Sequence, residues 1–133
     1  MKAYAVPPEV VAQLPPQVWR YVNDAVDRVG MAVSVQFDVY TGAAVLWIAL
    51  DDDNHIFGAA VTQIEEETAT KDRLLVIVAY GADDHEQVSE LMPRLDEYGR
   101  AEGCVRMRIY GRPGWQRKLP DFEVKAVIMD KEL

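Results

Sequence analysis

Hydrophobic and polar positions along this chain follow two periods, and each period predicts a kind of element. Apolar residues recur at helical spacing over 16–29 and over 84–101, and Gly30 and Gly103 are placed to cap these two helices. Continuous or alternating apolar residues are instead typical of strands. This second pattern covers the segments 44–50, 56–64, 73–80, 105–110 and 122–129.

The remaining segments carry weaker patterns. Residues 1–15 are rich in proline, which favours an extended lead-in. Residues 31–43 are ambiguous, although 34–42 could form a short second helix. Residues 111–119 predict a short turn or helix. Pro93 lies inside the second long helix, and its missing N–H predicts a kink there.

The order of these elements predicts the class of fold. A helix and a shorter helix precede a hairpin of strands, and a strand–helix–strand unit follows. This order is typical of an α/β (α+β) protein, in which helices pack on a mixed sheet. The length of 133 residues suits one domain, so we expect residues 1–133 to form a single domain.

The net charge of −8 is spread unevenly along the chain. Residues 51–102 hold 14 acidic and 4 basic residues, whereas 103–118 hold 5 basic residues and no acidic one. The overall charge should repel nucleic acid and anionic membranes, so we expect neither as a partner. The basic segment could contact an acidic protein surface. Its candidate contact residues are Arg106, Arg108, Arg112, Trp115, Arg117 and Lys118. The alternative is that these bases balance the acidic half within the fold or at a subunit contact.

Cysteine and metal-ligand patterns narrow the chemistry. The single cysteine, Cys104, excludes an internal disulfide framework, and its apolar surroundings predict a buried, inert thiol. Asp51, Asp53 and His55 alternate at a predicted turn, but Thr62 stands where an EF-hand loop needs a glutamate. We therefore expect a plain hairpin turn and no metal. The N-terminus lacks the apolar stretch of a signal peptide, which predicts a cytoplasmic location.

Particular stretches of the chain stand out within this order. They are Ile56-Phe57-Gly58-Ala59-Ala60-Val61, Ala101-Glu102-Gly103-Cys104 and Gly111-Arg112-Pro113-Gly114-Trp115. Together with the paired N-terminal helices, they make residues 16–131 resemble the GNAT superfamily of acyltransferases. The resemblance implies a GNAT-like mixed, mostly antiparallel central sheet with helices on both faces.

A closer resemblance concerns the strand Arg108-Ile109-Tyr110-Gly111-Arg112, which Gly114-Trp115 and Phe122 follow. This combination resembles a divergent branch of small GNAT-like proteins encoded by bacteriophages. Some members of that branch are linked with the virion head or its assembly. We therefore expect other protein subunits as partners, a homo-oligomer, and a location in the host cytoplasm or the virion.

The resemblance also locates a cofactor site. GNAT enzymes hold the acetyl-CoA pyrophosphate on a glycine-rich loop between a central strand and the next helix, where backbone N–H groups and the helix N-terminus face the phosphates. The candidate cofactor-binding residues at that junction are Val78, Tyr80, Gly81 and Ala82. The run Asp83-Asp84-His85-Glu86 follows, and its carboxylates should repel a pyrophosphate. We expect a degenerate site that binds no cofactor.

The catalytic residues that the resemblance implies are also altered. Many GNAT enzymes place a tyrosine, as general acid, five residues before the phenylalanine of a Gly-Phe pair. Here Arg117 holds that position and cannot usefully donate a proton at neutral pH, and Asp121 replaces the glycine. Tyr80 and Tyr110 remain candidate acids. Glu65 is a candidate base, although it also fits a solvated hairpin end.

These features favour a phage-type GNAT-fold protein with a degenerate acetyl-CoA site. Such a protein would act through protein–protein contact, as a virion or head-assembly component. The alternative is an N-acetyltransferase that uses acetyl-CoA and a small amine or a protein amine as acceptor. An acyltransferase toxin fits less well, because such toxins tend to be basic and to keep the glycine loop.

Overall fold

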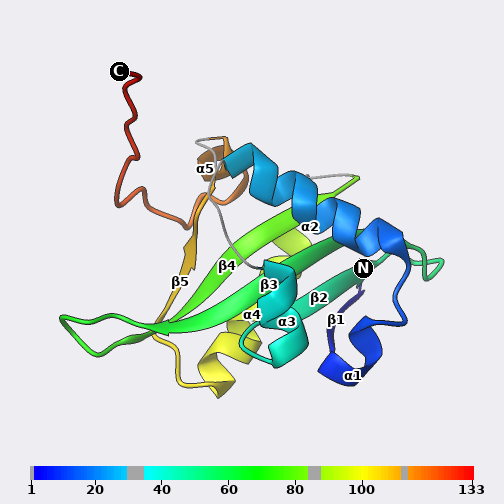
Figure 1. Ribbon diagram of the computed structural model, residues 1–133. Helices are drawn as coiled ribbons and strands as arrows, with labels where there is room; N and C mark the ends of the chain where they lie inside the picture. The colour runs from blue at the N-terminus through cyan, green and yellow to red at the C-terminus, as the bar shows by residue number, and fades with distance from the viewer. Residues whose placement is uncertain (1, 30–34, 84–87, 112–113) are drawn as a thin grey trace.

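A five-stranded sheet forms the centre of the computed structural model, which describes residues 2–29, 35–83, 88–111 and 114–133 (Figure 1). The strands follow one another across the sheet in chain order. They are β1 (Lys2–Val6), β2 (Val45–Leu50), β3 (Ile56–Glu66), β4 (Arg73–Ala82) and β5 (Arg106–Ile109). The first four pair antiparallel, whereas β4 and β5 pair parallel. The prediction of a mixed, mostly antiparallel sheet is confirmed.

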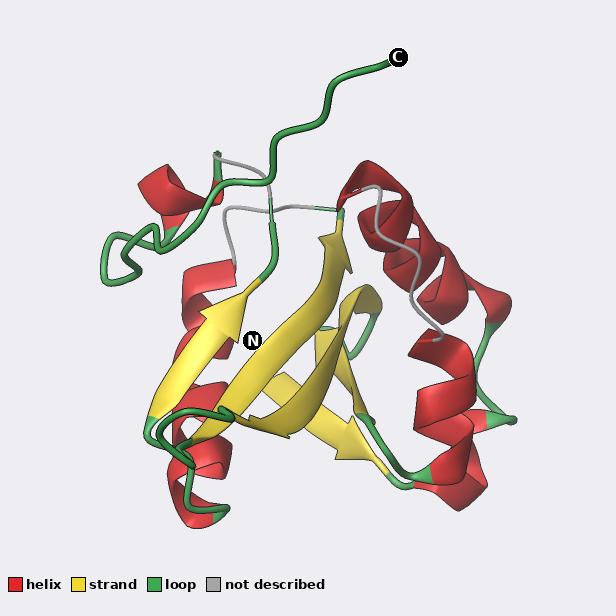
Figure 2. Cartoon of the chain, turned by 60° about the vertical axis from the view of Figure 1, so that its left-hand side comes forward, coloured by secondary structure: helices red, strands yellow, loops and turns green. Residues whose placement is uncertain are grey.

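Helices cover both faces of this sheet, as predicted. They are α1 (Pro8–Val11), α2 (Pro16–Val29), α3 (Val35–Thr41), α4 (Val88–Ala101) and α5 (Trp115–Lys118). Figure 2 shows α2 and α3 on one side of the strands and α4 on the other. The ambiguous segment after α2 does form the short second helix, and α4 continues through Pro93. Across the described residues, no helix combines the length and apolar character that crossing a bilayer requires.

One hydrophobic core lies between the sheet and the N-terminal helices. Val18 and Val22 stand one helical turn apart on α2 and are fully buried. They share a cluster with Val39 of α3 and with Leu46 and Val61 of the sheet. Burying each such side chain stabilises the fold by about 1.5–3 kcal/mol, so the amphipathic pattern of α2 decides which face it presents to the sheet.

A second core lies under α4 and is built around Trp47 of β2. The Trp47 side chain is fully buried, and its Nε1 donates a hydrogen bond of 2.9 Å to Oγ1 of Thr62 on β3. The ring of Tyr98 meets the indole edge-on, with 5.2 Å between the centroids. Leu95 completes the contact from α4. Because the buried indole N–H and the Thr62 hydroxyl pair with each other, neither polar group is left unsatisfied.

The N-terminal segment differs from its prediction as an extended lead-in over residues 1–15. Lys2–Val6 is a strand of the sheet, paired from Lys2↔Leu50 to Val6↔Leu46, and Pro8–Val11 is a helical turn. Proline explains the boundary, because it cannot donate to a strand ladder but suits the first turn of a helix.

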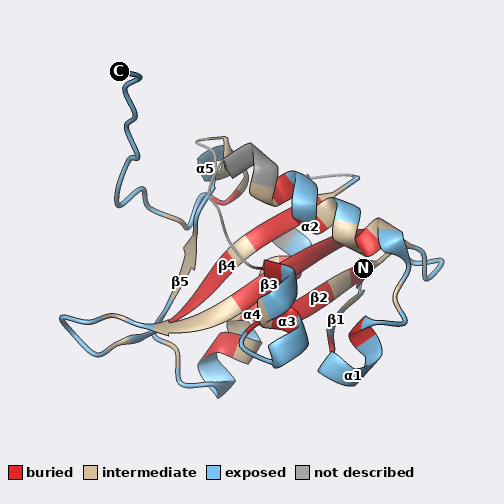
Figure 3. Cartoon of the chain, in the orientation of Figure 1, coloured by how far each residue is buried: buried red, intermediate tan, exposed pale blue. Residues whose placement is uncertain are grey.

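The C-terminal strand predicted over 122–129 is wrong for this structure. After Phe122 the chain has no regular structure and runs away from the sheet (Figures 1 and 3). Val127, Ile128 and Met129 are 75%, 70% and 87% exposed. The segment carries a strand pattern, but a strand exists only where a neighbour pairs with it, and none of the described residues does.

A β-bulge at Val78 shapes the end of β4. Val61 pairs with Ala79 and the next residue, Thr62, pairs with Ile77, which leaves Val78 as one extra residue. A bulge bends the strand that carries it and increases its twist. The parallel pairing with β5 ends at Ile77, at the bulge, so β4 and β5 part beyond it.

Candidate functional site

The candidate cofactor-binding residues Val78, Tyr80, Gly81 and Ala82 all lie on β4 beyond the point where β5 leaves it. On one side this stretch pairs with β3. On the other side, none of the described residues forms a strand with it. The bulge therefore opens a fork between two strands, with backbone N–H and C=O groups along one arm.

Tyr80 lies in this fork as a buried side chain rather than an open one. It is 6% exposed, and Trp115 of α5 meets its ring edge-on, with 5.5 Å between the centroids and 74° between the planes. Trp115, one of the candidate contact residues, is half-buried. Gly111 allows this arrangement, because a Cβ there would lie 2.5 Å from Cδ1 of the indole.

Gly81 serves the packing of a helix on the sheet. A Cβ at this position would lie 2.2 Å from the carbonyl oxygen of Tyr21, so only glycine lets the backbone of α2 come this close to β4. The sequence pattern assigned this glycine to a phosphate-binding loop. The contact between α2 and β4 requires glycine at position 81 whether or not a ligand binds.

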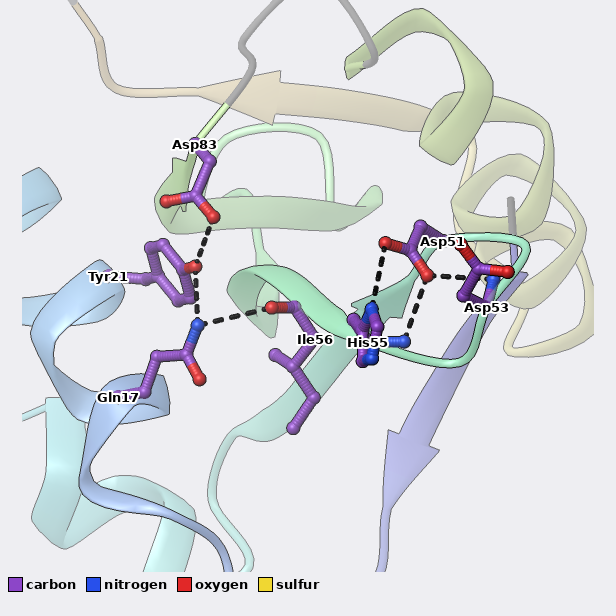
Figure 4. A network of polar contacts seen from close by, with 7 residues as sticks. All are labelled: Gln17, Tyr21, Asp51, Asp53, His55, Ile56 and Asp83. Carbon is purple, nitrogen blue, oxygen red and sulfur yellow. Dashed lines mark hydrogen bonds and ion pairs between the residues drawn. The ribbon is translucent and has the colours of Figure 1, made fainter.

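A carboxylate is fixed at the end of β4. The N–H of Asp83 donates to the Phe57 carbonyl at 2.9 Å, and its Oδ2 accepts a hydrogen bond of 2.8 Å from the Tyr21 hydroxyl. Gln17 donates through Nε2 to that hydroxyl at 2.8 Å and to the Ile56 carbonyl at 3.1 Å (Figure 4). Burial, and then the bond to Asp83, raise the pKa of Tyr21 above its ordinary value. Asp84, His85 and Glu86 lie outside the described residues.

The turn between β2 and β3 holds Asp51, Asp53 and His55, the residues weighed above as metal ligands. Oδ1 of Asp51 accepts hydrogen bonds of 2.9 Å from the backbone N–H groups of Asp53 and of His55. The ligand atoms of these three residues lie within 4.8 Å of one another (Figure 4). Asp51 therefore closes the hairpin turn in the way that aspartate commonly does, which accounts for its place in the sequence.

The single cysteine lies just before β5. Cys104 is half-buried rather than buried, and its N–H donates to the Gly99 carbonyl at 2.8 Å. Burial raises the pKa of its thiol, which disfavours the reactive thiolate. The prediction of an inert thiol therefore keeps its physical basis.

Comparison with known proteins concerns the fold. Neither a family model nor a curated protein matches this sequence. A probable acetyltransferase superposes with a TM-score of 0.67 at 15% identity, over 99% of this chain and 100% of the other. An aminoglycoside acetyltransferase from an uncultured soil metagenomic sample gives 0.68 at 13%, over 99% and 97%. Glucosamine-6-phosphate N-acetyltransferase from Arabidopsis thaliana gives 0.61 at 13%, over 98% and 97%.

The chain has the GNAT fold. These matches extend over nearly the whole of both chains, and the element order and the mixed sheet agree with them. Sequence identities this low establish the architecture, whereas activity depends on particular side chains placed on it.

The candidate acid and base of a GNAT-type reaction lie far apart. Tyr80 pairs with Ala60, whereas Glu65 pairs with Leu74 near the other end of β3. From Ala60 to Glu65 the distance along the strand is about 17 Å at roughly 3.4 Å per residue. Tyr110 follows β5 and is 38% exposed. The sheet therefore does not bring Glu65 and Tyr80 into one site.

The basic segment is divided between two faces of the GNAT fold. Arg106 binds the carboxylates of Glu67 and Asp72, at 2.7 and 3.1 Å from Nη2, and these bonds raise its pKa. For this residue the alternative holds, since it balances acids of its own chain. Met107 and Ile109 pack in the cluster that contains Trp115, so the residues alternating with them on β5 face the other way.

Three of the remaining contact candidates are described. Arg108 is half-buried on the same face as Arg106, Arg117 is exposed on α5, and Lys118 beside it is half-buried. Arg112 lies outside the described residues. The acidic residues of the hairpin 65–72 are the sequence feature from which the ion pairs of Arg106 could have been predicted. They lie beside the start of β5 only because β4 and β5 pair.

Proposed function

We propose that this GNAT-fold protein has lost the usual acetyl-CoA phosphate site and acts through contact with other proteins. The observation that carries the proposal is the carboxylate of Asp83 at the end of β4, held there by the Tyr21 hydroxyl at 2.8 Å. The GNAT resemblance assigns this place to the pyrophosphate. Asp83 is exposed, so water and salt screen its charge in part, but a pyrophosphate placed beside the carboxylate is still repelled and gains little from binding there.

A second feature supports the same proposal. The ring of Tyr80, the candidate acid on β4, is in edge-on contact with the indole of Trp115. The position where the resemblance expects a tyrosine holds Arg117, whose guanidinium stays protonated at neutral pH. A general acid must reach the leaving group, and neither side chain is arranged for this role.

The proposed partner contacts use separate bases, Arg108 of β5 and Arg117 of α5, rather than the whole basic segment. Arg108 and Arg117 form no ion pair with the described residues, and an acidic protein surface is the complementary partner. The resemblance to phage proteins makes a virion or head-assembly protein the partner of choice. That part of the proposal rests on the sequence alone.

A second function is favoured by the fork itself. The bulge at Val78 and the β4 edge beyond Ile77 leave backbone groups that could pair with an amide-containing chain such as the pantetheine arm of acetyl-CoA. The solved structures with this fold include acetyltransferases named for aminoglycosides and for glucosamine 6-phosphate. An N-acetyltransferase with an amine acceptor is therefore the alternative.

Calorimetric titration with acetyl-CoA and with CoA separates the two functions. We expect no heat of binding from the natural chain up to millimolar ligand, and no shift in its melting temperature. Saturable micromolar binding would contradict the proposal, since ligand at a hundred times its Kd stabilises a fold by about 2.7 kcal/mol.

A variant makes the test specific to the carboxylate. If Asp83 is what repels the phosphates, Asp83→Asn should bind CoA more tightly than the natural chain. Glu97→Gln removes the same charge from an exposed position of α4 and should change nothing. Equal effects of the two substitutions would mean that only net charge matters, and the assignment of Asp83 would be wrong.

A further inference from the structure

The indole of Trp115 contacts both arms of the fork between β4 and β5. On the β4 arm it meets the ring of Tyr80, which lies beyond Ile77, where the pairing of the two strands ends. On the β5 arm it lies beside Gly111, since a Cβ built there would be 2.5 Å from Cδ1 and 3.1 Å from Nε1 of the indole. One side chain therefore spans the gap between the two arms.

The helix that carries this indole is anchored at its far end. Leu119 follows α5 and is buried in the core under α4. Its N–H donates to the Trp115 carbonyl at 2.8 Å, which closes the helical turn. At the near end, Gly114 precedes Trp115 and has no side chain with which to cap the helix. The indole therefore fastens the first residue of α5 to the sheet.

A ligand that entered the fork would have to take the place of this indole. An entering chain with amide groups would pair with the backbone N–H and C=O groups of the β4 arm, beside Tyr80. Protein interiors are close-packed, so the space between the arms does not hold an indole and a second group together. The neutral pantetheine arm of an acyl-CoA can therefore enter only after Trp115 has moved out.

We propose that Trp115 is an autoinhibitory plug, which closes the fork while its indole lies between Tyr80 and Gly111 and opens it when displaced. The inference rests on the proposed function, because it adds a second obstacle to acetyl-CoA. The two obstacles differ in kind. The carboxylate of Asp83 acts on the charged phosphates, whereas Trp115 occupies the space of the neutral arm.

Calorimetric titration with pantetheine tests the plug, because this ligand carries no phosphate for Asp83 to repel. We expect Trp115→Ala to bind pantetheine at least about tenfold more tightly than the natural chain, since a site that is rarely open loses apparent affinity in proportion. Trp19→Ala is the matched control. It removes another half-buried indole, which lies against Tyr40 in the opposite layer, and should leave the affinity unchanged.

A second pair of variants displaces the indole without removing it. Gly111→Ala places a methyl group 2.5 Å from Cδ1 of Trp115, so the indole has to leave its position, and this variant should also bind pantetheine. Gly114→Ala adds the same methyl group where nothing lies within 4 Å, and it should behave as the natural chain does. Near-ultraviolet circular dichroism checks that each variant is folded, and Gly111→Ala decides the question if Trp115→Ala is not.

The plug is overturned if the folded Trp115→Ala and Gly111→Ala variants bind pantetheine no more tightly than the natural chain. An equal gain in Trp19→Ala or Gly114→Ala would overturn it as well, because general loosening of the fold would then explain the binding. The proposed function is judged separately, by acetyl-CoA and the natural chain. If the natural chain rejects acetyl-CoA and the opened variants reject pantetheine, the proposed function stands and the plug does not.

Discussion

Gly81 lies against the backbone of α2, and close contact rather than backbone conformation excludes a side chain at this position. We predict that Gly81→Ala lowers the free energy of unfolding by about 1–3 kcal/mol, because the new methyl group would overlap the Tyr21 carbonyl. Gly114→Ala is the matched control, because nothing lies within 4 Å of a Cβ there. Urea denaturation measures both. Equal stabilities would show that α2 can move away at no cost.

Tyr21 should make stability depend on alkaline pH. Its pKa in the folded chain is raised above the ordinary value near 10, by burial first and then by the bond to Asp83. The stability contributed by the neutral phenol is therefore complete below pH 10 and is lost as the pH rises through the folded pKa. We predict that Tyr21→Phe is less stable than the natural chain at neutral pH and that the difference shrinks above pH 10.

Thermal melts between pH 7 and 11 measure this difference. Tyr4→Phe, at an exposed position of β1, is the control and should parallel the natural chain at every pH. A constant gap between Tyr21→Phe and the natural chain across this range would contradict the raised pKa of the Tyr21 phenol.

Among the elements, β5 and the β3–β4 hairpin are joined by the ion pairs of Arg106. Arg106→Gln should lower the melting temperature by a small amount at low salt and by less at high salt, because exposed ion pairs are screened. Arg108→Gln, on the same face of the same strand, should show no salt-dependent change, because Arg108 forms no ion pair with any residue that the structure describes. Melts at several salt concentrations make the comparison, and equal salt dependence would exclude this role.

The sequence pattern predicted an element well when the residues of that element alone determine its structure. The helix over 16–29 has the predicted bounds, since Pro16 starts it and a regular apolar stripe continues through it. Strands were harder to predict, because a strand forms only where another segment pairs with it. Lys2–Val6 is short and weakly patterned but has β2 beside it, whereas 122–129 is well patterned and pairs with no strand in the described part of the chain.

At the scale of the whole molecule, the fold class followed from the order of helical and strand periods, and the site did not. The polar contacts of the candidate residues join positions far apart in sequence. Tyr21 and Asp83 are 62 positions apart, and Arg106 and Glu67 are 39 apart. No local pattern announces such pairs. The run of carboxylates after β4 was visible in the sequence, but the hydrogen bond that joins Asp83 to a tyrosine of α2 was not.

The two hydrophobic cores lie on opposite faces of one sheet. On β3, Ala59 and Val61 face the N-terminal helices, while Ala60 and Ile64 face α4. Alternation therefore divides each strand between two nearly independent hydrophobic layers. A change in one layer should be felt across the sheet mainly where backbone, rather than side chain, makes the contact, as Gly81 does.

Val78 is one residue more than the pairing of β4 with β3 requires. Without it, Ile77 would be followed by Ala79 and Tyr80 in plain alternation, with the pairing to β3 in step and each later side chain on its present face. As the extra residue of the bulge, Val78 bends β4 without changing the faces of the residues on either side, and its own side chain packs against the core under the N-terminal helices. Deleting Val78 would therefore straighten β4 while leaving the strand pairing in place. A chain shortened by this residue would keep both hydrophobic layers and lose the opening between β4 and β5.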